Sequence, residues 1–148
     1  LSLWMAAHLG GIFLDRLVYG LWLSCPGIPD MFYGVHLSQD ILQSAGVRRY
    51  KTEFISCPGC GRTLYNLQES VAKVKKAFAH LSRLKIAVMG CVVNGPGEMG
   101  DADYGYVGAG NGKVNLFRGK EMVRVAVPEE EAIEALKQLI KENGDWND

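Results

Sequence analysis

The chain has 148 residues, and its 16 Lys and Arg residues balance 16 Asp and Glu residues, so the formal net charge is zero. With 48% hydrophobic and 22% charged residues, it has the composition of a folded globular protein, which excludes wholesale disorder. Zero net charge argues against nonspecific nucleic-acid binding and against a polybasic membrane anchor, because both need an excess of basic residues. Since the first residue is Leu1 and not Met, we expect an internal piece of a longer protein.

The first 50 residues differ in composition from the rest, with seven of the 14 aromatic residues but only six of the 32 charged ones. The apolar stretch from Leu1 to Leu23 carries Asp15-Arg16 in its middle, which disfavours a membrane span, and it lacks the basic start of a signal peptide. A membrane segment is therefore the less favoured alternative. We interpret residues 1–50 as an N-terminal segment, either a remnant of a preceding domain or a linker, with a turn over 25–30 and a short helix over 35–45.

Residues 51–148 carry a clearer pattern of apolar residues and turn signals. Asn66 and Glu69 form a capping-box pattern at the start of a helix, and Pro128 precedes a second helix with three glutamates in its first turn. Asn111-Gly112 is a hairpin signal. The predicted elements are strands over 52–56, 86–89, 104–107, 114–117 and 122–127, and helices over 66–81 and from 128 to about 143. This order predicts an α/β domain over 51–148, with two layers and a mixed sheet.

Three cysteines follow two of these strands. Cys57 and Cys60 come directly after the first strand, and Cys91 comes after the strand that follows the first helix. If the two strands are parallel, both end at the same edge of the sheet, where ligands bind in open α/β folds. We therefore expect the three thiols to converge. Such a triad suits zinc or an iron–sulfur cluster, while Cys57 and Cys60 alone suit a redox disulfide, and buried structural thiols remain the plain alternative.

A carboxylate returns to this edge seven residues after Cys91. Glu98 lies in the turn that contains Gly95, Pro96 and Gly97, which can fold the chain back towards the cysteines. A hard oxygen ligand among soft sulfurs is unusual for a structural metal site, but it suits a cluster with one exchangeable iron. We interpret Cys25 as a small buried apolar residue, and the three histidines as surface or core residues and not as ligands.

Two motifs give a more specific indication. The run from Glu53 to Gln68, which contains Cys57-Pro58-Gly59-Cys60, and the run from Met89 to Glu98 resemble the cluster-binding domain of the 4-hydroxy-3-methylbut-2-enyl diphosphate synthase family. This family belongs to the methylerythritol phosphate route to isoprenoids. The resemblance extends from about Lys51 to Asn143, and residues 1–50 match the family less clearly.

The resemblance implies a fold like that of the sulfite and nitrite reductase cluster domain. It implies a [4Fe–4S] cluster with Cys57, Cys60, Cys91 and Glu98 as ligands, and it places Asn94 near the substrate. The implied reaction is the reductive ring opening of 2-C-methyl-D-erythritol 2,4-cyclodiphosphate with loss of one oxygen as water, and ferredoxin or flavodoxin supplies the two electrons. The family's N-terminal barrel of TIM type, which holds the diphosphate, is missing from this sequence. The implied location is the bacterial cytoplasm, or the plastid for a plant-like source.

Two classes of function follow for the chain. The first is an oxidoreductase domain that is inactive without its barrel. The second is a noncatalytic electron-transfer or metal-binding module, for which ligation by cysteines alone is the usual arrangement. Glu98 favours the first class.

Overall fold

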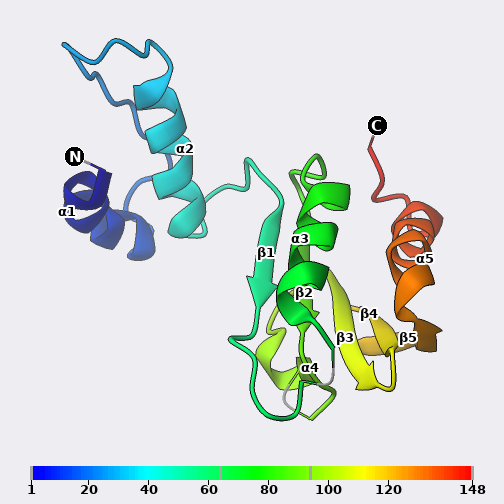
Figure 1. The fold of residues 1–148 in the computed structure, drawn as a ribbon. Helices are drawn as coiled ribbons and strands as arrows, with labels where there is room; N and C mark the ends of the chain where they lie inside the picture. The colour runs from blue at the N-terminus through cyan, green and yellow to red at the C-terminus, as the bar shows by residue number, and fades with distance from the viewer. Residues whose placement is uncertain (1, 64, 94, 148) are drawn as a thin grey trace. The chain divides into compact units, whose positions relative to one another are not determined.

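The residues that follow Tyr50 form a five-stranded sheet with helices in the computed structural model, which describes residues 2–63, 65–93 and 95–147 (Figure 1). The chain divides into two compact units at the boundary between Tyr50 and Lys51. The elements of the second unit are β1 (Glu53–Ser56), α3 (Leu67–Phe78), β2 (Lys85–Met89), α4 (Gly95–Glu98), β3 (Tyr104–Gly110), β4 (Lys113–Arg118), β5 (Glu121–Pro128) and α5 (Glu129–Glu142).

These elements confirm the predicted mixed α/β domain and its order of strands and helices. The helix predicted over 66–81 is shorter in the structure, where it ends at Phe78. After Phe78 the chain forms a turn, which is closed by a hydrogen bond of 3.1 Å from the Leu81 N–H to the Phe78 carbonyl. The short helix α4 was not predicted, since a segment with two glycines and a proline indicates a turn. The Asn111-Gly112 hairpin is confirmed, with φ of 52° and 67° at these two residues.

The strand order in the sheet follows the chain, from β1 to β5. β1, β2 and β3 are parallel neighbours, whereas β4 and β5 continue the sheet in antiparallel hairpins. Ser56 pairs with Val88, so the last residue of β1 lies one position from the end of β2. The parallel part of the sheet therefore delivers the residues after β1 and after β2 to one edge.

Each face of the sheet has its own apolar cluster. Ile86 and Val88 point to the face covered by α3 and α5, together with Tyr104 and Tyr106 of β3. The alternate residues of the same strands point to the other face, where Met99 and Ala102 cover them after α4. Because successive residues of a strand face opposite sides, the apolar run of β2 is buried on both faces.

In the first unit, the described residues 2–50 include the helices α1 (Ser2–Leu14) and α2 (Tyr33–Ser44). Phe13 packs with Leu37, Ile41 and Leu42 in a small core of its own. The turn predicted near Cys25 is present, with φ of +85° at Gly27. None of the helices in the described residues combines the length and the apolar character that a membrane crossing needs.

Candidate functional site

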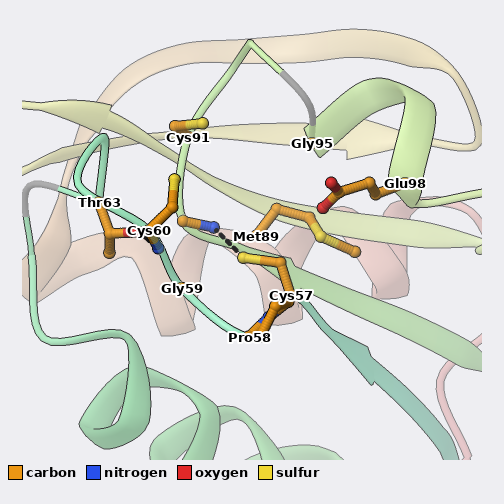
Figure 2. Close-up of a pocket in the computed structure, with 10 residues that line it drawn as sticks. Cys57, Pro58, Gly59, Cys60, Thr63, Met89, Cys91, Gly95 and Glu98 are labelled. Atoms are coloured by element: carbon orange, nitrogen blue, oxygen red, sulfur yellow. Dashed lines mark hydrogen bonds between the residues drawn. The ribbon is translucent and has the colours of Figure 1, made fainter.

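The parallel pairing of β1 and β2 places the cysteine segments next to each other. Cys57 is the first residue after β1, and Cys91 is the second residue after β2. Between them, a pocket of about 70 Å³ is lined by Cys57, Cys60, Cys91 and Glu98 (Figure 2). Thr63 and Met89 also line this pocket. Four side chains that the sequence singled out thus surround one small cavity at the carboxyl ends of two parallel strands.

The thiols are open to the solvent side of this edge. All four cysteines of the chain are among the described residues and all are thiols, with Cys57 and Cys91 half-buried and Cys60 exposed. The Gly90 N–H donates a hydrogen bond to the Cys57 Sγ at 3.1 Å, drawn as the dashed line in Figure 2. An amide that points at sulfur stabilises negative charge on it, which is the charge that a metal-bound thiolate carries.

Glu98 reaches the pocket from α4. The first residue of this helix, Gly95, is buried between Met89 and Val107, where a Cβ would lie 3.0 Å from atoms of both side chains. The Met99 N–H bonds to the Gly95 carbonyl at 2.9 Å, and the side chain of Met99 is buried. Packing on either side therefore fixes α4 against the sheet, while the Glu98 carboxylate itself stays exposed and faces the thiols (Figure 2).

The donor set has the composition that a cluster with three sulfur ligands and one oxygen ligand would need. In the part of the chain that the structure describes, no three His, Cys, Asp or Glu side chains are placed to share one metal ion. Zinc needs every thiolate within about 2.3 Å of one point. In an iron–sulfur cluster each ligand binds its own iron, so the ligands lie further apart. Three thiols and a carboxylate around one cavity, with an N–H directed at sulfur, fit that arrangement.

Tyr65 connects the two cysteine segments through a hydrogen bond. Its hydroxyl donates a hydrogen bond to the Met89 carbonyl at 2.8 Å, and its ring lies against Gly108, where a Cβ would overlap it. Burial is the main reason that the pKa of the Tyr65 phenol is raised, followed by the nearby Tyr106 and Cys57. The bond from the Tyr65 phenol thus ties the chain that follows Cys60 to the end of β2.

The sequence-predicted residues are distributed as follows. Cys57, Cys60, Cys91 and Glu98 come together, Asn94 lies outside the described residues, and Cys25 belongs to the first unit, where it is half-buried near Gly34. Sequence reasoning missed Gly90 and Tyr65. Gly90 could have been noticed as a glycine between a buried strand and a cysteine, because such a glycine often marks a close approach of two segments.

Comparisons with known proteins identify the family of the chain. A family model described as the GcpE protein C-terminal domain matches residues 53–142. The chain is 53% identical over 148 residues to the 4-hydroxy-3-methylbut-2-en-1-yl diphosphate synthase (flavodoxin) of Porphyromonas gingivalis, a match that covers 100% of this chain and 25% of the relative. A protein of the same name in Leptospira interrogans is 54% identical over 143 residues, and the match covers 97% of this chain and 22% of the relative. Another, in Chlorobaculum tepidum, is 48% identical over 147 residues, and the match covers 93% of this chain and 20% of the relative.

The chain thus spans a quarter or less of the length of these curated relatives. The family match covers most of the second unit, and the relatives match both units. The resemblance inferred from the two cysteine motifs is therefore confirmed, and the chain belongs to the family of the GcpE protein C-terminal domain.

Proposed function

We propose that this chain is the cluster-carrying part of a 4-hydroxy-3-methylbut-2-enyl diphosphate synthase. Cys57, Cys60, Cys91 and Glu98 hold a [4Fe–4S] cluster in this proposal. The observation that supports it most directly is the single pocket that these four side chains line at the ends of β1 and β2. A likeness to the cluster domain of sulfite and nitrite reductases goes with this proposal and is consistent with the mixed sheet.

The proposed reaction opens the ring of 2-C-methyl-D-erythritol 2,4-cyclodiphosphate. Two electrons and two protons enter, the C–O bond between a ring carbon and the diphosphate is broken, and the C–O bond of a neighbouring hydroxyl group is broken, so that its oxygen leaves as water and a C=C double bond forms. When bound, the cluster supplies single electrons and an iron that accepts a substrate oxygen. The relatives named above carry flavodoxin in their names, so flavodoxin is the proposed electron donor, with ferredoxin as the alternative.

The residues of this chain divide the task between them. The thiolates of Cys57, Cys60 and Cys91 provide ligands that do not dissociate readily. Glu98 would provide an exchangeable oxygen ligand from an exposed position at the pocket. The buried attachment of Gly95 would hold α4, and with it Glu98, beside the three thiolates.

The remainder of the enzyme lies outside this sequence in the proposal. The relative from Porphyromonas gingivalis is about four times as long as this chain. The part of it that this chain does not match is proposed to include the barrel that binds the diphosphate. Residues 1–50 are proposed to be a remnant of the domain that precedes the cluster domain, or a linker to it. The chain by itself should therefore not convert substrate, and the complete enzyme is proposed to work in the cytoplasm.

A noncatalytic electron-transfer module is the competing function. It is less well supported, because an oxygen ligand exchanges more readily than a thiolate. Ready exchange of a ligand is useful for substrate binding but not for electron transfer. The test uses the complete protein that contains this chain, reconstituted with iron and sulfide without oxygen. Addition of the cyclic diphosphate should change the visible and electron paramagnetic resonance spectra. An unchanged spectrum together with intact electron exchange with flavodoxin would indicate a carrier.

A further inference from the structure

The two cysteine-bearing segments contact each other at Thr63 and Gly90. Thr63 follows Cys60 by three residues, and Gly90 directly precedes Cys91. The Cβ and Cγ2 atoms of Thr63 each lie 3.2 Å from the position that a Cβ on Gly90 would occupy, and the Thr63 hydroxyl oxygen would overlap it. The Thr63 side chain thus occupies the space that any other residue at position 90 would need.

Rotation of Thr63 does not free this space without loss. A change of χ1 that turned the Cβ hydrogen towards position 90 would remove the overlap with the hydroxyl, but it would break the bond from the Cys60 N–H to the Thr63 Oγ1 and leave the Cβ at 3.2 Å. The φ of Gly90 lies outside the left-handed region, so an alanine here meets no backbone strain. Contact with Thr63 is therefore the obstacle to a side chain at position 90.

Hydrogen bonds extend this contact to the cysteines. The Cys60 N–H donates to the Thr63 Oγ1 at 3.3 Å, and the Gly90 N–H donates to the Cys57 Sγ at 3.1 Å. One bond lies within the Cys57–Cys60 segment, while the other crosses from the Cys91 segment. The spacing of the two segments thus determines two distances. One is the length of the N–H···S bond, and the other separates Cys91 from the other two thiols.

We propose that Thr63 and Gly90 are positioning residues, which set the distance between the two cysteine segments and thereby the retention and the reduction potential of the cluster. This inference rests on the proposed function. Groups that orient metal ligands commonly change affinity by about 10- to 100-fold when they are replaced. Hydrogen bonds to the ligand sulfurs also tune the potential of a cluster, so displacement of Gly90 should change it.

The test compares Gly90→Ala, Thr63→Ala and the double variant in the 148-residue chain reconstituted with iron and sulfide without oxygen. Gly61→Ala is the matched control, because Gly61 directly follows Cys60 and a Cβ there meets nothing within 4 Å. The readouts are iron and sulfide bound per chain, the rate at which a chelator removes iron, and the midpoint potential of the cluster. Circular dichroism of each variant reports whether it folds.

Gly90→Ala should lose iron to the chelator about 10- to 100-fold faster than the unsubstituted chain, with a more negative potential from the weakened N–H···S bond. Thr63→Ala should have a smaller effect. The double variant should return to the behaviour of Thr63→Ala, because removal of the hydroxyl and the methyl group leaves only the contact with the Cβ at position 63, at 3.2 Å, which a shift of a few tenths of an ångström relieves. Gly61→Ala should behave like the unsubstituted chain.

Two results would overturn the positioning role: a Gly90→Ala chain that matches Gly61→Ala, or a double variant no better than Gly90→Ala. If Gly90→Ala does not fold, recovery of folding in the double variant supports the contact, and its absence counts against it. An unsubstituted chain that binds no cluster would refute the proposed function and the positioning role with it. A cluster in the unsubstituted chain combined with either overturning result would refute the positioning role alone.

Discussion

Glu98 is the residue that separates the two functional classes, because it is proposed to supply oxygen where a carrier would supply a fourth sulfur. Its carboxylate is exposed and lines the same pocket as the three thiols. A fourth thiol, Cys25, lies in the first unit. If Cys25 were a ligand, the cluster would be closed by sulfur and a substrate oxygen would have no iron to bind.

Substitution of these two residues should therefore have opposite results. Glu98→Ala should leave one iron labile to chelators and abolish turnover in the complete enzyme. Cys25→Ala should leave the iron content and the spectrum nearly unchanged, whereas alanine at Cys57, Cys60 or Cys91 should lose the cluster. Iron analysis after anaerobic gel filtration measures this directly. A cluster that survives Glu98→Ala but not Cys25→Ala would be that of an all-cysteine carrier.

The sequence indicates the candidate ligands but not the residues that position them. Cys57, Cys60 and Cys91 can be found because strand ends at one edge of a parallel sheet converge, whatever the details of the turns. The contact between Thr63 and Gly90 joins residues 27 positions apart, and it depends on the register in which Ser56 pairs with Val88. Strand register is a property of the assembled sheet, so no local sequence pattern predicts this contact.

At the scale of elements, α3 links the site to the core because it begins next to the cysteine segment. The Asn66 side chain accepts a hydrogen bond from the Glu69 N–H at 3.2 Å, and it donates to the Glu69 carboxylate. The N-terminal cap predicted from the sequence is thus confirmed. A helix whose first turn is fixed in this way holds the segment after Tyr65 in a defined position.

Loss of this cap should loosen α3. Asn66→Ala should lower the free energy of local unfolding of residues 67–78 by about 1 kcal/mol, because a backbone N–H loses its partner. Amide hydrogen exchange over these residues measures the effect. Asn66→Asp should preserve it, and Gln68→Ala, an exposed position of the same turn, is the control. Equal exchange in Asn66→Ala and Gln68→Ala would show that the cap contributes little.

Buried tyrosines in the core that α3 and α5 cover should make the folded chain unstable at high pH. Burial, and secondarily the Glu129 carboxylate, raises the pKa of Tyr106 to about 12, and burial also raises the pKa of Tyr65 and Tyr104. A tyrosine in the unfolded chain loses its proton near about pH 10. Between these values the folded state keeps a proton that the unfolded state releases, so stability falls as the pH rises.

Replacement of Tyr106 tests this expectation. The chain should unfold between about pH 10 and about pH 12, with the circular dichroism signal lost as tyrosinate absorbance appears. Tyr106→Phe should make the dependence of stability on pH less steep in this range. Tyr19→Phe, which removes an exposed tyrosine, should leave it unchanged. The same slope in both variants would mean that Tyr106 titrates alike in the folded and unfolded chain.

The elements themselves were predictable to different degrees. Strands β1 to β5 follow from short apolar runs between turn signals, and α3 and α5 follow from helical spacing and their caps. Helix α1 was not predicted, because it contains the Gly10-Gly11 pair, which the sequence presents as a break. Helix α4 was not predicted either, because its residues have low helix propensity. It is stabilised by the burial of Gly95 and Met99 against the sheet.

At the scale of the whole molecule, the second unit holds the complete set of proposed cluster ligands. The relatives extend well beyond it, so the substrate site is proposed to form when this unit meets the barrel. The fold class could be predicted from sequence because the order of elements restricts the arrangement of a sheet. The geometry of the pocket could not, since it depends on how two turns pack against each other.

The central claim is that three thiolates and one carboxylate hold a [4Fe–4S] cluster on this chain. Mössbauer spectroscopy of the chain reconstituted with isotopically enriched iron tests it most directly, because the isomer shift of each iron reports its ligands. We expect one iron that differs from the other three, and we expect this difference to disappear when Glu98 is replaced by Cys. Four irons with the same sulfur ligation in the unsubstituted chain, or a chain that takes up zinc and no iron, would contradict the account.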